Sequence, residues 1–191
     1  MILKLILQTL WLFLPALLAN LTPPLMKKVN LLNKPIDFNL KFRGKRLLGD
    51  NKTIRGLVFG VIVGILIALL QSFLYQYDTF ISDIHIFQWF SVIDYSGLGI
   101  FNIIFLGFLL GFGALFGDMV ESFFKRQIGI KPGRPFFPFD QIDFLIGAIA
   151  FLTIIYMPSW QIIVTLLIIG ILLHLLANLI GYLIGVNKRM I

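Results

Sequence analysis

The sequence GLVFGVIVGILIALLQSFL, at residues 56–74, contains no charged side chain. A helix needs about 20 mostly apolar residues to cross the roughly 30 Å hydrocarbon core of a bilayer. The helices of a soluble core are usually shorter and carry polar residues on one face. The stretch therefore predicts a transmembrane helix.

Four further apolar stretches accompany the first. They cover residues 2–25, 97–117, 144–157 and 160–186. The stretch at 144–157 is short, and it spans only if Gln141 and Asp143 sit at its end. Of all residues 59% are hydrophobic and 13% are charged, whereas soluble domains are about half apolar and about a quarter charged. We expect an all-α, polytopic integral membrane protein with five transmembrane helices, folded as a single membrane-embedded domain over residues 1–191.

Glycines recur at every fourth residue in two of these stretches. They are Gly56, Gly60 and Gly64, then Gly107 with Gly111 and Gly113 with Gly117. Residues four apart share one face of a helix, and small residues on that face let helices approach closely. Small side chains could also leave room for a lipid chain or a polar cleft, but we favour close helix packing.

Charge is unevenly divided among the polar segments. The net charge is +7. In a soluble protein this charge would suggest nucleic-acid binding, but in a membrane protein its distribution among the loops indicates the orientation of the chain. With five spans, residues 26–55, residues 118–143 and the C-terminus share one side, and that side holds fifteen of the sixteen Lys and Arg residues. Because basic loops resist translocation, we expect this side to be cytoplasmic and the N-terminus to be outside. Cleavage of the first stretch as a signal peptide, the alternative, would place nine cations outside.

The chain has no cysteine and only two histidines. A disulfide framework and thiolate chemistry are therefore excluded. A zinc site of Cys and His is also disfavoured, because neither histidine has a partner at ligand spacing.

Four carboxylates form two pairs beside the third and fourth apolar stretches. Asp118 and Glu121 are three residues apart, as are Asp140 and Asp143, so each pair shares a helical face. Carboxylates at an apolar boundary are costly unless they are paired or bind a cation. Oxygen ligands without His or Cys suit Mg²⁺ or Mn²⁺. The acids could instead pair with nearby Lys and Arg side chains, but two pairs that flank one basic loop favour a metal site.

A basic segment precedes the second apolar stretch. Residues 43–55 read RGKRLLGDNKTIR, and Asn51 or Thr53 could cap the helix that follows. Lys52 and Arg55 would then lie at the helix N-terminus, where free N–H groups and the helix dipole favour an anion. Ordinary cytoplasmic positive charge is the alternative. It explains less well why an acid and a threonine lie among the cations.

One face of the membrane is thus expected to present cations, carboxylates able to hold Mg²⁺, and access from the bilayer. Such a site suits phosphoryl or nucleotidyl transfer, because metal ions and basic side chains reduce the repulsion between two anionic reactants. A transporter would need charges within the spans, and residues 56–74 and 97–117 have none. A scaffold protein would not explain the paired acids.

Six short motifs occur in order along nearly the whole chain. They are LPALLAN (14–20), PIDF (35–38), GKRLLGDNKTIRG (44–56), GDMVESFFKR (117–126), GIKPGRP (129–135) and DQIDF (140–144). In this order they resemble the CDP-archaeol synthase family, archaeal relatives of the phosphatidate cytidylyltransferases. The resemblance implies five membrane helices, a site open to the cytoplasm, and an Mg²⁺-dependent nucleotidyltransferase of phospholipid biosynthesis.

The implied reaction joins CTP to a lipid phosphate in the cell membrane. The lipid would be unsaturated archaetidic acid, 2,3-bis-O-(geranylgeranyl)-sn-glycerol 1-phosphate, and the products would be CDP-archaeol and pyrophosphate. An ester lipid of the phosphatidate type is the alternative substrate, because uniformly apolar spans do not reveal the lipid linkage.

The matching motif positions also imply a role for each site residue. Metal would be held by Asp118, Asp140 and Asp143. Lys52 would join these acids in catalysis and would hold phosphates together with Arg55, Lys125 and Arg126. The nucleotide pocket would be shaped by Asp50, Asn51, Thr53 and Gln141, and Ser122 is expected to be a further ligand-binding residue. Glu121 stands where a small residue is expected, so the resemblance assigns it no role.

Overall fold

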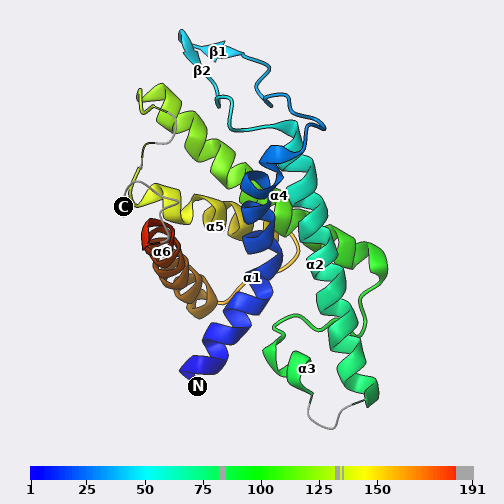
Figure 1. Ribbon diagram of the computed structural model, residues 1–191. Coiled ribbons are helices and arrows are strands. Elements are labelled where there is room, and N and C mark those ends of the chain that lie inside the picture. Colours follow the sequence, from blue (N-terminus) through cyan, green and yellow to red (C-terminus); the bar gives the residue numbers. More distant parts are fainter. Residues whose placement is uncertain (82–84, 132–133, 135, 184–191) are drawn as a thin grey trace.

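The computed structural model describes residues 1–81, 85–131, 134 and 136–183. Within these residues the elements are α1 (Ile2–Leu25), the 3₁₀ helix η1 (Met26–Lys28), β1 (Lys41–Phe42), β2 (Lys45–Arg46), α2 (Ile54–Ile81), α3 (Ile86–Phe90), α4 (Ile100–Gln127), α5 (Phe139–Leu152) and α6 (Trp160–Leu183). The two short strands lie together at one end of the helices (Figure 1). The described chain is therefore mostly helical, as predicted.

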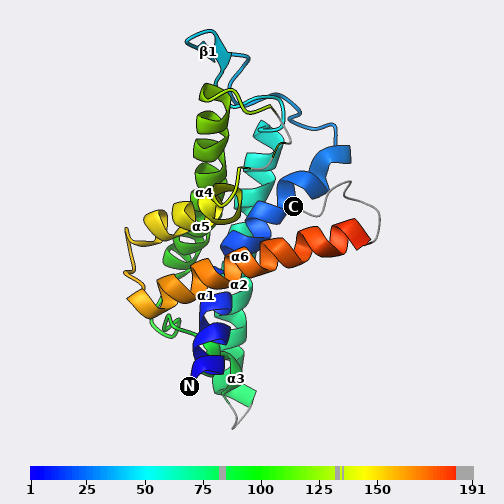
Figure 2. The same cartoon turned by 90° about the vertical axis from the view of Figure 1, so that its left-hand side faces the viewer.

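Three long helices, α1, α2 and α4, form the frame of the molecule. Each is long and apolar enough to cross a membrane, over Ile2–Lys28, Ile54–Asp78 and Ile100–Gln127. They pack against one another; α1 and α4 cross in the view of Figure 1, and all three stand roughly upright in the view of Figure 2. The chain is therefore a membrane protein with at least these three apolar helices, and α1 has the bounds predicted for the first span.

Helix α4 continues well past the predicted span at 97–117 and ends at Gln127. Residues 118–127 contain neither glycine nor proline, so nothing in them breaks the helix. Lys125 and Arg126 lie in the last turn, where positive charge is favourable. Asp118 and Glu121 therefore stand on a continuous helix and not in a loop.

Helices α5 and α6 differ more from the predicted spans. Helix α5 begins and ends five residues before the predicted stretch at 144–157. Its 14 residues extend roughly 21 Å at 1.5 Å per residue, less than the roughly 30 Å of a hydrocarbon core. Helix α6 crosses the long helices at a steep angle (Figure 2). Residues 184–186 of the last predicted span, and the C-terminus, lie outside the described residues.

Glycines form the closest contacts between the helices. A Cβ at Gly64 would lie 2.9 Å from the Gly107 carbonyl oxygen and 2.9 Å from Gly111 Cα, where α2 meets α4. A Cβ at Gly113 would lie 2.8 Å from the Gly147 carbonyl oxygen, where α4 meets α5. The close packing expected from the glycine spacing is therefore confirmed, and it presses α5 against α4.

Residues 29–53 form a folded loop over one end of the long helices (Figure 1). β1 and β2 pair antiparallel through a turn at Arg43 and Gly44, and both turn residues have positive φ, as tight two-residue hairpins require. The loop returns to the start of α2, where Ile36 N donates to the Lys52 carbonyl oxygen at 2.8 Å. This contact holds the segment before α2 against the rest of the loop.

Candidate active site

Three carboxylates meet where α4 and α5 pack together: Asp118 and Glu121 from α4, and Asp143 from α5. Each offers one oxygen, and these oxygens lie within 4.8 Å of one another. The helices approach this closely only because residue 117 is glycine, since a side chain there would run into the backbone carbonyl of Asp143. Grouped carboxylate oxygens are the ligands that Mg²⁺ and Mn²⁺ prefer. We call these three residues the acid cluster, and it could hold a metal ion.

Lys125 links the acid cluster to Asp140. Its Nζ lies 3.2 Å from Glu121 Oε1 and 2.7 Å from Asp140 Oδ1, and both Lys125 and Glu121 are buried. The contact with Asp140 has hydrogen-bond geometry, whereas Glu121 Oε1 accepts no hydrogen bond from any described residue. The positive charge of Lys125 offsets part of the cost of burying the Glu121 carboxylate, but no hydrogen bond within the described part of the chain completes the pair. A cation bound by the acid cluster would lower the remaining cost.

Lys52 reaches the acid cluster from the loop before α2. Its ammonium group forms an ion pair with Asp118, although the two residues are 66 positions apart in the sequence. Thr53 Oγ1 accepts a hydrogen bond from Gly56 N at 3.2 Å, so Thr53 is the residue that caps α2. The basic segment and the acids therefore meet, as predicted.

A polar cavity of about 400 Å³ opens beside Lys52. Its cations are Lys27, Lys52 and Arg55, and Asp118 forms part of its wall. The remaining lining residues are Asn20, Pro23, Pro24, Asn33, Asp50, Asn51 and Thr53. Three cations around one cavity suit a ligand with several phosphates.

A second cavity, of about 560 Å³, lies between α4 and α5 and is apolar. Glu121 and Asp143 are the charged residues in its wall. The other lining residues are Phe116, Gly117, Val120, Phe124, Ile128, Phe136, Phe139, Ile142, Ile146, Gly147, Ala150 and Phe151. Of the acid cluster, Asp118 thus lines the polar cavity, and the other two residues line the apolar one.

A family model described as CarS-like, CDP-archaeol synthase, matches residues 2–190. The chain belongs to the CDP-archaeol synthase family. The CDP-archaeol synthase of Methanocaldococcus jannaschii is 34% identical over 185 residues, covering 96% of each chain. That of Methanopyrus kandleri is 36% identical over 183 residues, covering 94% of this chain and 90% of the relative. A solved structure described as an intramembrane enzyme for archaeal membrane lipids biosynthesis has a TM-score of 0.68 at 32% identity, covering 89% of this chain and 92% of that one.

Several residues expected from the likeness to CDP-archaeol synthases have other partners. Arg55 lines the polar cavity but is 4% exposed, and its Nη1 donates to the Val29 carbonyl oxygen. Arg126 donates to a backbone carbonyl oxygen in the loop after α4. Ser122 and Gln141 are buried and line neither of the two cavities. These four residues surround the site, but only Arg55 lines one of its two cavities.

Asp140 differs from the other acids expected to bind metal. Its Oδ1 accepts from Lys125 at 2.7 Å and its Oδ2 accepts from Phe136 N at 2.8 Å. Glu121, to which the family resemblance assigned no role, joins Asp118 and Asp143 in the acid cluster instead. The three-residue spacing from Asp118 to Glu121 was the signal in the sequence. A metal-binding role for Asp140 stays a prediction.

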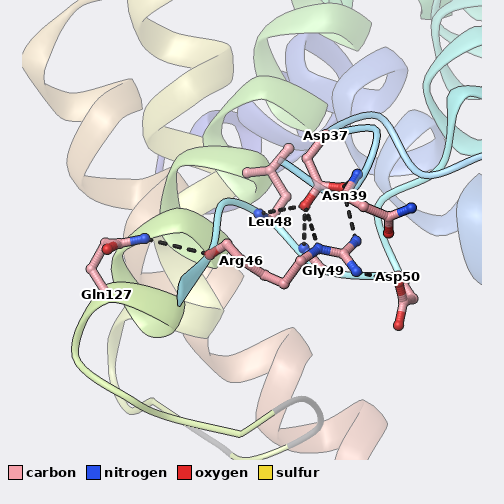
Figure 3. A network of polar contacts seen from close by, with 7 residues as sticks. All are labelled: Asp37, Asn39, Arg46, Leu48, Gly49, Asp50 and Gln127. Atoms are coloured by element: carbon pink, nitrogen blue, oxygen red, sulfur yellow. Dashed lines mark hydrogen bonds and ion pairs between the residues drawn. The ribbon is translucent and has the colours of Figure 1, made fainter. Parts of the chain in front are cut away.

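Asp37, for which the sequence predicted no role, lies at the centre of a network of polar contacts (Figure 3). Its carboxylate accepts from the Arg46 guanidinium at 2.8 and 3.1 Å, and from the backbone N–H groups of Asn39, Leu48 and Gly49 at 3.0 to 3.1 Å. Burial opposes ionisation, but these hydrogen bonds outweigh it and hold the pKa of Asp37 well below its usual range. Its place in the PIDF motif was the only signal in the sequence.

Proposed function

We propose that this chain transfers the cytidylyl group of CTP to unsaturated archaetidic acid and so forms CDP-archaeol and pyrophosphate. Membership of the CDP-archaeol synthase family supports the reaction. One observation supports placing the active site at the acid cluster. Asp118 lines a cationic cavity, and both Glu121 and Asp143 line an apolar cavity. A reaction between a nucleotide and a lipid phosphate requires such a junction.

We infer that Mg²⁺ is the cofactor and that Asp118, Glu121 and Asp143 hold it. The donor set fits, because it consists of carboxylate oxygens and because Glu121 Oε1 is buried without a hydrogen-bond donor. When bound, Mg²⁺ would neutralise phosphate charge and stabilise the leaving pyrophosphate. Asp140 would serve the same site by holding Lys125 beside it.

The cations of the polar cavity would bind the triphosphate of CTP. Lys27 reaches this cavity from η1, Lys52 from the loop before α2, and Arg55 from the first turn of α2. Asn51 and Thr53 line the same cavity and would shape the nucleotide pocket. Positive charge held here reduces the repulsion between CTP and the approaching lipid phosphate.

The hydrocarbon chains of the lipid would lie in the apolar cavity, with the phosphate at the acid cluster. A bond forms between a lipid phosphate oxygen and the α-phosphorus of CTP while the bond from that phosphorus to the pyrophosphate oxygen breaks. The second pKa of a phosphomonoester is about 6, so the lipid phosphate is largely dianionic at pH 7. The attack therefore needs no general base, which agrees with a site of carboxylates and cations.

We also propose five membrane segments in a single domain, with the N-terminus outside and the active site facing the cytoplasm. The distribution of Lys and Arg supports this orientation. The chain has no cysteine, so single cysteines can report the orientation directly. An impermeant thiol reagent should label Gly97→Cys in intact cells and Lys41→Cys only after permeabilisation. The opposite pattern would overturn the orientation.

The reaction is tested with purified protein, labelled CTP, Mg²⁺ and lipid phosphates that differ only in ether or ester linkage. We expect CDP-lipid to form fastest with the geranylgeranyl ether lipid. Faster turnover of the ester lipid would favour the phosphatidate-type alternative. If a folded protein formed CDP-lipid from none of them, the proposed reaction would be wrong.

A further inference from the structure

We propose that Asp37 is a positioning residue that holds Lys52 at the acid cluster by gathering the preceding loop around its carboxylate. The proposal rests on the proposed function, in which Lys52 binds the triphosphate of CTP. Asp37 itself lines neither of the two cavities described above, so it would act through its neighbours and not on the substrate.

The Asp37 carboxylate is fully engaged. Its side chain has no exposed surface and its two oxygens accept five hydrogen bonds, two from Arg46 and three from backbone N–H groups. Burying an ionised carboxylate is costly unless it is paired and hydrogen-bonded. Here the donors come from both sides of the β1–β2 hairpin, so the ionised group draws that segment into one conformation (Figure 3).

Two short hydrogen-bonded connections link Asp37 to the backbone of Lys52. On one side, Asp37 Oδ2 accepts from Gly49 N at 3.0 Å, and the Gly49 carbonyl oxygen accepts from Lys52 N at 3.3 Å. On the other side, Ile36, the residue before Asp37, donates its N–H to the Lys52 carbonyl oxygen at 2.8 Å. The backbone of Lys52 is therefore bound on both sides by groups that Asp37 orders. Gly49 has a φ of +97°, a conformation that glycine adopts readily, so the turn forms without backbone strain.

The same network ties the loop to the helix that carries Asp118. Arg46, which binds Asp37, accepts a hydrogen bond at its carbonyl oxygen from Gln127 Nε2 at 3.4 Å (Figure 3). Lys45 Nζ donates to the Gln127 carbonyl oxygen. Because Gln127 ends α4, the loop is anchored to the helix that bears Lys52's partner. Asp37 thereby sets the position of Lys52 relative to α4.

The informative substitution is Asp37→Asn, which keeps the size of the side chain and removes its charge. Oδ2 accepts three donors and Oδ1 accepts two, so the NH₂ group of asparagine would face at least two N–H donors in either orientation. The loop must then rearrange. We expect kcat/KM for CTP to fall about tenfold to a hundredfold, as for a catalytic group displaced by about 1 Å.

A double-mutant cycle with Lys52→Met separates positioning from general structural damage. If Asp37 acts through Lys52, Asp37→Asn should lower kcat/KM by less than about threefold in the Lys52→Met background. Asp94→Asn is the matched control, because Asp94 also accepts several hydrogen bonds, from Ser96 and Tyr75, but lies outside the active site. The control should keep wild-type turnover.

Arg46→Gln provides a second variant in case Asp37→Asn does not fold. This variant keeps the three backbone N–H donors to Asp37. It should lower kcat/KM for CTP by less than Asp37→Asn does, and this decrease should also depend on the presence of Lys52. The role of Asp37 would be wrong if kcat/KM fell equally in the wild-type and Lys52→Met backgrounds, or if it fell in neither variant. Wild-type turnover would still support the proposed function in that case. If a folded wild-type protein made no CDP-lipid, both the proposed function and the role of Asp37 would be wrong.

Discussion

Replacing Gly117 by alanine should disrupt the active site without touching a charged group. Gly117 lies on α4 directly before Asp118 and faces α5 at Asp143 and Gly147. The added methyl group would run into the Asp143 carbonyl oxygen. Helix α5 would have to move away from α4, and that movement would separate Asp143 from the other two members of the acid cluster.

The displacement follows from the distances around Gly117. A Cβ there would lie 3.1 Å from Gly147 Cα and 3.0 Å from the carbonyl carbon of Asp143. Carbon atoms pack best about 3.5–4.0 Å apart, so α5 would retreat by roughly 0.5–1 Å. Metal–ligand distances tolerate only about 0.2 Å, and a displacement of about 1 Å can cost a factor of about 100 in rate. We expect turnover to fall about 100-fold, with about 1–3 kcal/mol of lost stability from overpacking.

The assay is CDP-lipid formation from labelled CTP over a range of Mg²⁺ concentrations, together with thermal unfolding in detergent. Gly97→Ala is the matched control, because a Cβ at Gly97 would meet nothing within 4 Å. The control should match the wild type in both measurements. If Gly117→Ala kept wild-type turnover and the wild-type requirement for Mg²⁺, the glycine contact would not be what assembles the acid cluster.

Three further predictions follow from the same geometry. Asp143→Asn and Asp140→Asn should both lower turnover strongly, but only Asp143→Asn should raise the Mg²⁺ concentration needed for half-maximal activity, because Asp140 is bound to Lys125; equal shifts would make both acids metal ligands. Ala150→Trp should fill part of the apolar cavity and raise KM for the lipid but not for CTP, whereas Leu70→Trp on the exposed face of α2 should change neither; unchanged lipid KM would place the chains elsewhere. Because the pKa of Asp37 is lower in the folded than in the unfolded chain, its carboxylate stabilises the fold fully above about pH 4 and progressively less below it. The difference in unfolding temperature between wild type and Asp37→Ala should therefore shrink below about pH 4, and a constant difference down to acid pH would contradict this.

The long apolar helices were predictable, and so were both ends of α1, but the ends of α2, α4 and α5 were not. The span at 2–25 agrees with α1 because helix formation in an apolar run depends mainly on local hydrogen bonding and hydrophobicity. Hydropathy located the third span but not the helical turns that follow it, because residues 118–127 are polar and yet favour a helix. The early start of α5 was missed for the same reason: its first turn, with Asp140, is too polar to register as a span. Its early end was missed because the sequence stays mostly apolar from Leu152 to Met157, so hydropathy does not mark where the helix stops.

The sequence by itself determined the apolar helices, the uneven distribution of charge, and the acids and cations from which a site could be built, because these depend on composition and on spacings of a few residues. It also determined the glycine faces on which the helices pack. Only the tertiary structure decided which acids meet, because that depends on how α5 lies against Gly117 and on which face of each helix is turned inwards. The same holds for the contact of Lys52 with Asp118, since groups 66 residues apart are brought together by packing and not by local preference.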